Sequence, residues 1–312
     1  YSNTRGAASL AQIRQLVFAN HAPFHFDLSI LDIFAAVAAA ACLVIVPENR
    51  QSLGHALNQL VFDEDITIWY SVPNVLIRML AAGNVNMLSA SNLRVVLFAG
   101  EVFPVKHLRS LRDTLPGMEL YNLYGPTETN VCTYYQVTDV GDQPVPIGRA
   151  CSYARTVLLD ENGNVTDTEG ELCVGGASVM LGYWGDPAKT LQRMVDDLYR
   201  TGDIVRLSAD GDLVFLGRRD HMVKIRGNRI ELGEVEAVLL SHPAVTQAAV
   251  VVVAERLEAY VMGDVAESAI RRHCLENLPR YMVPERVRPM ESLPLTSTGK
   301  IDRPALTALP GS

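Results

Sequence analysis

The sequence lacks several features that mark other classes of protein. No apolar run reaches the roughly 18 residues that a membrane-spanning helix needs, and residues 1–5 do not begin a secretory signal. Basic residues are in deficit, since 27 Lys and Arg stand against 35 Asp and Glu, a net charge of −8. A nucleic-acid backbone attracts basic surfaces. We therefore expect neither a membrane nor a nucleic acid as a partner.

Cysteine is also scarce. The five cysteines are widely spaced and form no C-x-x-C pair, so neither a disulfide framework nor a zinc site is indicated. We expect a cytoplasmic protein with reduced thiols. Apolar residues make up 48% of the chain and charged residues 20%, a composition that supports a packed core and excludes general disorder. The 312 residues predict about two domains.

The first half of the chain alternates between short apolar strands and helices. An Ala-rich apolar run, residues 33–46, is predicted as a buried helix that leads into a strand. Strands that alternate with helices indicate a parallel α/β architecture. From apolar runs and apolar spacings of three and four residues, the predicted strands are 43–46, 66–69 and 95–98, and the predicted helices are 53–60 and 74–82.

Turn residues become dense from about residue 141. Residues 140–219 are predicted to form a small antiparallel, barrel-like subdomain, with a strand at 171–174. A small α+β domain follows, and we place the boundary at Asp220, which divides the chain into 1–219 and 220–312. The elements predicted for this last domain are a hairpin at 222–230 turning at Gly227 and Asn228, helices at 233–241 and 266–278, and a strand at 247–253.

Two segments carry polar groups suited to a nucleotide. Residues 122–129, Asn-Leu-Tyr-Gly-Pro-Thr-Glu-Thr, offer a ring to stack on a base, a hydroxyl for a phosphate and a carboxylate for Mg²⁺. A Gly-Pro turn capped by Thr explains this segment about equally well. Asp203, in Tyr-Arg-Thr-Gly-Asp at 199–203, is suited to accept both hydroxyls of a ribose, although a plain turn is the simpler interpretation of this segment alone.

Two further segments are basic. Residues 217–236 contain five basic side chains, but the alternation of apolar and basic residues around Val223 predicts a half-buried strand rather than a nucleic-acid patch. Lys300 follows a glycine on a polar loop near the C-terminus. It is similar to a Walker lysine only superficially, because the spaced upstream glycine is absent.

In this order, the segments resemble those of the adenylate-forming enzymes, and within them the adenylation domains of nonribosomal peptide synthetases. The resemblance implies the acyl-CoA synthetase/luciferase-like fold: a large α/β domain with a small barrel-like subdomain, and a small mobile C-terminal α+β domain. It covers residues 18–307. The segments that carry it are 26–29 (Phe-Asp-Leu-Ser), 122–128, 170–172 through 182–184, 199–203, 217–236, 278–284 and 299–303.

The resemblance implies a ligase that uses ATP and Mg²⁺ to form an aminoacyl-AMP and then loads the phosphopantetheine thiol of a carrier protein. The small domain would rotate about Asp220 between the two half-reactions, and the hairpin at Gly227 would approach the site in the second. The residues that the resemblance places at the nucleotide are Tyr124 stacked on adenine, Gly125 beside it, Thr127 at the α-phosphate, Glu128 at Mg²⁺, Asp203 and Arg218 at the ribose, and Lys300 between the substrate carboxylate and the nucleotide.

The amino-acid pocket is implied in the same way. Asp27 would pair with the α-amino group of the substrate. The rest of the pocket is almost entirely apolar, so a charged substrate side chain would remain unpaired, and several leucines leave space only for a small one. The combination is similar to free-standing ligases that load L-proline, although an ordinary α/β core would also contain such residues. The matching positions are Leu28, Leu31, Tyr70, Leu97, Ala99, Leu123, Val131 and Cys132.

One part of the family pattern is missing. A Gly/Ser/Thr-rich phosphate loop that ends in lysine precedes the aromatic-Asp segment in the family, and residues 1–26 contain nothing similar. We therefore expect that the sequence lacks about the first third of a longer protein. Two alternatives remain: a non-catalytic remnant that binds a carrier protein, and an acyl-CoA or aryl-acid ligase, which Asp27 disfavours.

Overall fold

The computed structural model describes residues 16–219, 222–225, 228–254 and 256–309. It divides into two compact units, one formed by residues 1–155 with 175–185 and the other by 156–174 with 186–312. Asp220, the predicted hinge and boundary, and Gly227, the predicted hairpin tip, lie outside the described residues. Within the described ranges, no helix is long and apolar enough to cross a membrane.

The first unit is built on a seven-stranded sheet in the order β2-β1-β3-β4-β5-β6-β7. Strands β1 to β5 are parallel, and β6 and β7 add antiparallel pairs at one edge. The strands are β1 Val17–Asn20, β2 Cys42–Ile45, β3 Ile68–Ser71, β4 Val95–Ala99, β5 Glu119–Tyr124, β6 Thr133–Gln136 and β7 Arg149–Ala150.

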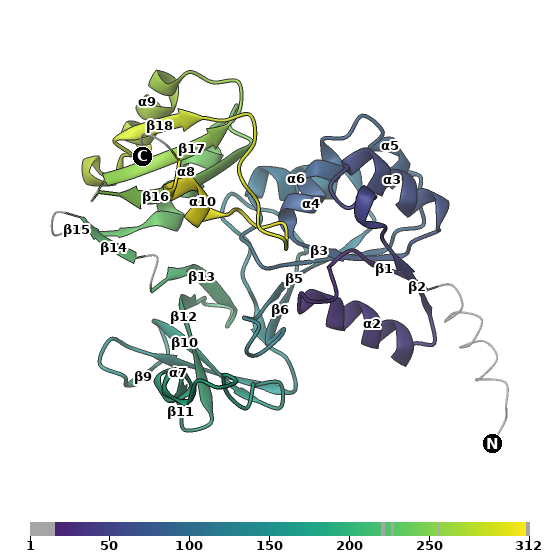
Figure 1. Cartoon of the computed structure of the whole chain (residues 1–312), viewed down its shortest axis with the longest axis horizontal. Helices are drawn as coiled ribbons and strands as arrows, with labels where there is room; N and C mark the ends of the chain where they lie inside the picture. Colours follow the sequence, from purple (N-terminus) through teal and green to yellow (C-terminus); the bar gives the residue numbers. More distant parts are fainter. Residues whose placement is uncertain (1–15, 220–221, 226–227, 255, 310–312) are drawn as a thin grey trace. The chain divides into compact units, whose positions relative to one another are not determined.

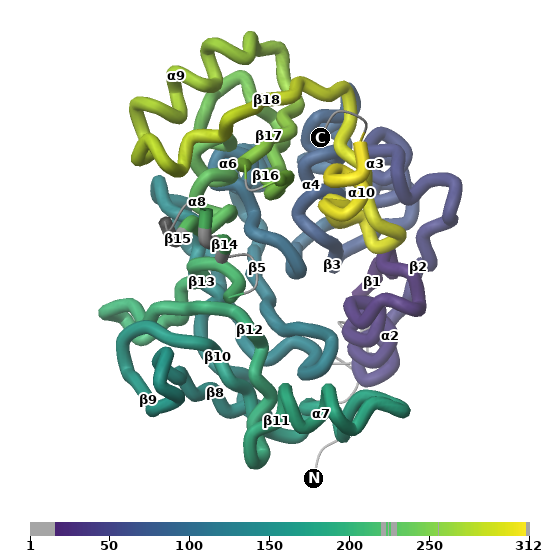
Figure 2. Tube along the Cα trace, turned by 60° about the vertical axis from the view of Figure 1, so that its left-hand side comes forward, coloured from purple at the N-terminus to yellow at the C-terminus, as the bar shows by residue number. Residues whose placement is uncertain are grey.

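Helices cover both faces of this sheet. Figures 1 and 2 show α2 on one face, and α3, α4, α5 and α6 on the other. The chain changes faces between β1 and β3, so a topological switch point lies at the carboxyl ends of these strands, where α/β sheets commonly bind ligands. The helices are α2 Leu28–Ala38, the 3₁₀ turn η1 Glu48–Arg50, α3 Gly54–Asp63, α4 Pro73–Leu80, α5 Asn86–Ser89 and α6 Val105–Thr114.

The predicted parallel α/β architecture is confirmed, and the prediction for α2 needs a correction. The strands expected at 43–46, 66–69 and 95–98 are β2, β3 and β4, with shifts of at most two residues at either end. The expectation of a buried helix is wrong, because Phe34 and Val37 are 64% and 74% exposed. Only the opposite face, with Leu28 and Ala36, is buried. Because apolar residues occur all around α2, its composition did not reveal that only one face is buried.

The second unit contains an antiparallel sheet in the order β11-β12-β10-β8-β9, with β13 paired to β12. The dense turns of this region therefore predicted its antiparallel character correctly, and the strand expected at 171–174 lies inside β10. The elements are β8 Ala154–Leu159, β9 Val165–Thr166, β10 Glu169–Gly176, α7 Pro187–Arg193, β11 Met194–Val195, β12 Leu198–Leu207 and β13 Leu213–Arg218.

The C-terminal elements form a hairpin and a three-stranded sheet in the order β16-β17-β18. The helices and the strand predicted here are confirmed to within one residue. Asn228, expected in the hairpin turn, instead pairs with Ile225 as a strand residue. The elements are β14 Met222–Ile225, β15 Asn228–Glu231, α8 Leu232–Ser241, β16 Gln247–Val253, β17 Arg256–Met262, α9 Glu267–Asn277, the 3₁₀ turn η2 Arg280–Met282, β18 Arg286–Pro289 and α10 Arg303–Thr307.

Candidate functional site

The loop after β5 presents the first group of predicted nucleotide residues. Tyr124 ends the strand, and its carbonyl accepts a 2.8 Å hydrogen bond from the backbone N–H of Cys132, which closes the loop. At Gly125, a Cβ would lie 1.7 Å from the carbonyl oxygen of Asn130, so only glycine fits. Thr127 is exposed at the outer part of the loop. The backbone therefore holds these predicted residues together in a tight turn.

Tyr183, which lies in the recognised segment 182–184 but for which no role was predicted, holds the carboxylate of this loop in place. The hydroxyl of Tyr183 donates a 2.6 Å hydrogen bond to Oε1 of Glu128. The carbonyl oxygen of Glu128 accepts a second hydrogen bond, of 2.8 Å, from the backbone N–H of Met180. The side chain and the backbone of Glu128 are thus both held by the segment 175–185 of the same unit.

The donor set around Glu128 fits Mg²⁺ only in part. Mg²⁺ takes oxygen ligands and is usually held by one or two carboxylates together with phosphate oxygens and water. Glu128 supplies such a carboxylate on a partly exposed loop. Among the described residues, no group of three His, Cys, Asp or Glu side chains could hold a metal ion. A bound nucleotide would therefore have to complete the coordination.

Asp27 lies directly before α2, near the switch point of the sheet. It occupies the N-cap position, yet its side chain caps no backbone N–H. Its Oδ1 atom is buried and has no hydrogen-bond partner. A buried, unpaired carboxylate oxygen is costly unless a donor or an opposite charge approaches it. This geometry is suited to an ammonium group.

The predicted pocket residues lie on neighbouring strands but do not all line one cavity. Register places Tyr70 opposite Leu97, and Ala99 opposite Leu123, across β3, β4 and β5. Tyr70, Ala99 and the buried Leu28 belong to the apolar core of the unit, and Leu97 packs against it. Cys132 is a fully buried free thiol. None of these residues except Leu123 is among those that line the cavity described next.

A separate hollow opens between α2 and the loop after β5. Its volume is about 370 Å³, within the usual range for a small-molecule site. Three of the predicted pocket residues line it: Leu31, Leu123 and Val131. The other lining residues, absent from the prediction, are Ile30, Phe34, Ala35, Asn130, Tyr134, Cys151 and Tyr153.

A cluster of buried polar side chains lies between α2 and the sheet, and no sequence motif indicated it. Asp32 is 1% exposed, and its Oδ2 accepts a 3.1 Å hydrogen bond from the side-chain amide of Asn20 at the end of β1. Burial raises the pKa of Asp32 to about 8, and the hydrogen bond from Asn20 opposes this shift. The Tyr70 hydroxyl is also buried without a partner. Burial raises the pKa of Tyr70, and the charges of Asp32 and Asp27 add to the effect.

In the second unit, the structure brings Asp203 and Arg218 together. They are register partners on β12 and β13, and Nη1 of Arg218 donates to Oδ1 of Asp203 at 3.0 Å. Asp203 is 5% exposed, whereas about a third of the Arg218 side chain is exposed. The two residues predicted at the ribose thus form an ion pair in which Arg218 is the more exposed partner.

Lys300 lies on a closed loop before α10. Its carbonyl oxygen accepts a 2.7 Å hydrogen bond from the N–H of Thr296, and its own N–H donates to Oγ1 of Thr296 at 3.2 Å. Gly299, with a φ of +84°, makes the reversal possible. Asp302 donates its N–H to the Pro294 carbonyl at 2.8 Å and closes the base of the loop.

A partly buried ion pair anchors the chain just beyond this loop. Arg303 donates from Nη2 to both carboxylate oxygens of Glu236, at 2.9 and 2.8 Å. Oε1 of Glu236 also accepts a 2.8 Å hydrogen bond from the N–H of Val250 in β16. Burial raises the pKa of Glu236, and the charge of Arg303 partly offsets the shift. The loop that carries Lys300 is thereby fastened to α8 and β16.

Two family models match most of the sequence. The model of the AMP-binding enzyme family matches residues 2–184, and that of the AMP-binding enzyme C-terminal domain matches residues 234–300. The chain belongs to the AMP-binding enzyme family. The adenylate-forming fold that the motifs implied is confirmed.

Individual proteins show more specific similarities than the family models do. The chain is 46% identical over 302 residues to an L-proline--[L-prolyl-carrier protein] ligase of Pseudomonas fluorescens, covering 93% of the chain and 59% of the relative. A ligase of the same name from Streptomyces coelicolor is 43% identical over 305 residues, covering 92% and 57%. The chain thus spans about three fifths of the length of these relatives. Among solved structures, NpsA of Klebsiella oxytoca in complex with 3-hydroxyanthranilyl-AMSN has a TM-score of 0.83 at 25% identity, covering 97% of this chain and 66% of NpsA.

Proposed function

We propose that the full-length protein uses ATP to activate a small apolar amino acid and then transfers it to the phosphopantetheine thiol of a carrier protein. L-Proline is the first candidate for this amino acid. Family membership and the names of the two ligases support this assignment. The observation that carries it is the buried Oδ1 of Asp27, which has no hydrogen-bond partner. An ammonium group supplies both the donor and the opposite charge that this atom lacks.

In the first half-reaction, a carboxylate oxygen of the amino acid attacks the α-phosphorus of ATP. The bond from this phosphorus to the oxygen that bridges to the β-phosphate breaks, and pyrophosphate leaves. Both reactants are anions, so the site must offset their repulsion. We assign the Lys300 ammonium, a compact charge on a flexible stem, to the space between carboxylate and nucleotide, and the Thr127 hydroxyl to the α-phosphate.

The remaining contacts would orient the nucleotide. We assign Tyr124 to stacking on adenine beside Gly125, and Asp203 with Arg218 to the ribose hydroxyls. Glu128, held by Tyr183 through a 2.6 Å hydrogen bond, would bind Mg²⁺ together with the phosphates. Mg²⁺ bound there supplies positive charge that neutralises the phosphate oxygens.

In the second half-reaction, the thiolate sulfur of the carrier arm attacks the acyl carbon. The bond from this carbon to the phosphate oxygen of AMP breaks, and AMP leaves. We retain Asp220 as the proposed hinge and domain boundary, and the Gly227 hairpin as the element that approaches the site in this step. A cytoplasmic location with reduced cysteines remains part of the proposal.

Pyrophosphate exchange into ATP across a panel of carboxylic acids tests the function. The full-length protein should support exchange with L-proline, and Asp27→Ala should abolish it, because the ammonium would lose its charged partner. Exchange supported only by acids that lack an amino group would favour an acyl-CoA or aryl-acid ligase. Absence of exchange with carrier binding retained would favour a non-catalytic remnant.

A further inference from the structure

Strand β12 departs from regular pairing at the segment that contains Asp203. Glu171 of β10 pairs with Ile204, whereas Cys173, two residues on, pairs with Arg200. Three residues of β12, at 201–203, therefore lie opposite a single residue of β10. Gly202 within this bulge has a φ of +78°. A bulge removes ladder hydrogen bonds, so its backbone groups need other partners.

The side chains of Glu171 and Thr201 replace the missing ladder bonds. Oε1 of Glu171 accepts a 3.1 Å hydrogen bond from the N–H of Gly202. Oγ1 of Thr201 donates to the Leu172 carbonyl at 2.8 Å and accepts from the N–H of Asp203 at 3.0 Å. The backbone on the N-terminal side of Asp203 is thus defined by side-chain hydrogen bonds.

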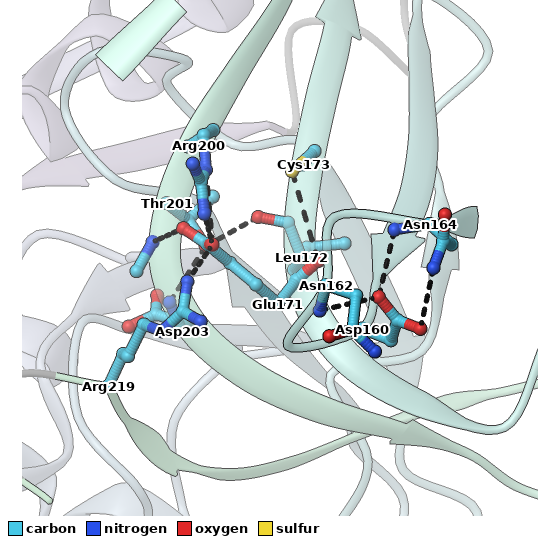
Figure 3. Close-up of polar contacts among 11 residues, drawn as sticks. Asp160, Asn162, Asn164, Glu171, Leu172, Cys173, Arg200, Thr201, Asp203 and Arg219 are labelled. Carbon is cyan, nitrogen blue, oxygen red and sulfur yellow. Dashed lines mark hydrogen bonds and ion pairs between the residues drawn. The ribbon is translucent and has the colours of Figure 1, made fainter. Parts of the chain in front are cut away.

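The second oxygen of Glu171 connects this bulge to two arginines. Oε2 accepts from Nε of Arg200 at 3.1 Å and from its Nη2, and from Nη1 of Arg219 at 2.9 Å. Figure 3 shows Glu171 at the centre of these contacts, with Asp203 close by. Only 4% of the Glu171 side chain is exposed, so these charge-assisted bonds are poorly screened by solvent.

Arg219 returns to the same glycine through its backbone. Its N–H donates a 2.6 Å hydrogen bond to the carbonyl oxygen of Gly202. Glu171 is therefore connected to Gly202 by two routes. Its side chain accepts a hydrogen bond from the N–H of Gly202, and it also binds Arg219, whose backbone N–H donates to the carbonyl oxygen of Gly202. A Cβ at Gly202 would lie 3.3 Å from Nη2 of Arg218, so the bulge also packs against the partner of Asp203.

We propose that Glu171 is a positioning residue for the nucleotide site and sets the direction in which Asp203 presents its carboxylate to the ribose. This inference rests on the proposed ribose role of Asp203. Glu171 touches no substrate atom in this scheme. It acts by fixing the bulge between Arg200 and Ile204, and loss of its charge would let Asp203 and Arg218 reorient.

Discrimination between ATP and 2′,3′-dideoxy-ATP measures this role directly, because the analogue lacks both ribose hydroxyls. A site that hydrogen-bonds a hydroxyl rejects the analogue that lacks it. In pyrophosphate exchange by the full-length protein, we expect Glu171→Gln to reduce the preference in kcat/KM for ATP at least about tenfold, with the KM for the amino acid unchanged. An unchanged preference would overturn the proposal.

Glu258 provides a matched control. It is a buried glutamate with two arginine partners, Arg288 at 3.1 Å and Arg286 at 3.6 Å, and 3% of its side chain is exposed. Glu258→Gln should lower the melting temperature and leave the ribose preference intact. An equal loss of preference in this variant would mean that general destabilisation, not positioning, explains the result.

A parallel variant separates this inference from the proposed function. Asp203→Asn should lose the preference for ATP; if it does not, the ribose assignment itself is wrong. If Asp203→Asn loses the preference and Glu171→Gln keeps it, only the positioning role is refuted. Should Glu171→Gln fail to fold, Arg219→Ala, at a side chain that is 41% exposed, tests the same connection. It should weaken the preference in the same direction, and unchanged discrimination would count against the proposal.

Discussion

Tyr183 and Glu128, 55 positions apart in the sequence, are joined by a 2.6 Å hydrogen bond from the phenol to Oε1. The bond fixes one oxygen of the carboxylate proposed to bind Mg²⁺. We expect Tyr183→Phe to raise the Mg²⁺ concentration for half-maximal exchange by about fivefold, since a net hydrogen bond contributes about 1 kcal/mol. Titration of exchange activity with Mg²⁺ measures this shift.

Tyr121→Phe is the control for this prediction. The Tyr121 hydroxyl donates a similar 2.7 Å hydrogen bond to Glu119, but the pair is exposed and lies outside the proposed site. Its removal should leave the Mg²⁺ requirement unchanged. A shift of equal size in both variants would contradict the role of Tyr183.

Asp32 should make stability depend on pH. Its pKa rises from 3.8 to about 8 on burial, so the folded protein retains a proton that the unfolded chain releases. The free energy of unfolding should therefore fall as the pH rises from about 4 to about 8, by several kcal/mol, and this contribution should level off above that range. In Asp32→Asn, which mimics the protonated acid, this dependence should disappear.

Urea denaturation at a series of pH values measures the effect. The quantity of interest is the difference in unfolding free energy between wild type and Asp32→Asn, because other groups cancel in it. Asp167→Asn, at an exposed position, is the control and should leave the pH profile of the wild type in place. A constant difference between wild type and Asp32→Asn would show that Asp32 is ionised in the folded protein.

Gly125 should tolerate no side chain. In Gly125→Ala the new Cβ would lie 1.7 Å from the Asn130 carbonyl oxygen, so the loop must shift. We expect a loss of about 2 kcal/mol in unfolding free energy, together with weaker nucleotide binding, measured by denaturation and by titration with a fluorescent ATP analogue. Gly117→Ala, where no atom lies within 4 Å of the Cβ, should change neither quantity; equal effects would argue against the steric explanation.

The Glu236–Arg303 pair should hold the C-terminal loop in place. The pair is only partly buried, with 14% of the Glu236 side chain and 33% of the Arg303 side chain exposed, so Glu236→Gln should lower the unfolding free energy by about 1 to 3 kcal/mol, less than the loss of one partner from a fully buried pair. It should also accelerate proteolytic cleavage near Lys300, which mass spectrometry can locate. Glu285→Gln, which breaks a more exposed pair with Arg256 at 3.5 Å, should have little effect. Unchanged cleavage in Glu236→Gln would exclude the anchoring role.

The sequence predicted what depends on local pattern. Short apolar runs located β2 and β4, and the order of motifs indicated the family. No role was predicted for Glu171, although this residue lies in a recognised segment. The proposed role depends on the register shift between β10 and β12, which the spacing of residues in the sequence does not reveal. Asp32 was missed for a related reason: its partner Asn20 is on a different element, and only folding brings the two together.

The closed loop around Lys300 has a kinetic consequence. Because the hydrogen bonds between Thr296 and Lys300 already define the backbone, the role proposed for Lys300 requires no further ordering of the main chain of this loop. Each backbone residue that has to be ordered costs about 1 to 2 kcal/mol. Folding has therefore already met this backbone part of the entropic cost. In the proposed adenylation step, the ammonium would therefore be presented from a preformed loop rather than from one that must first become ordered.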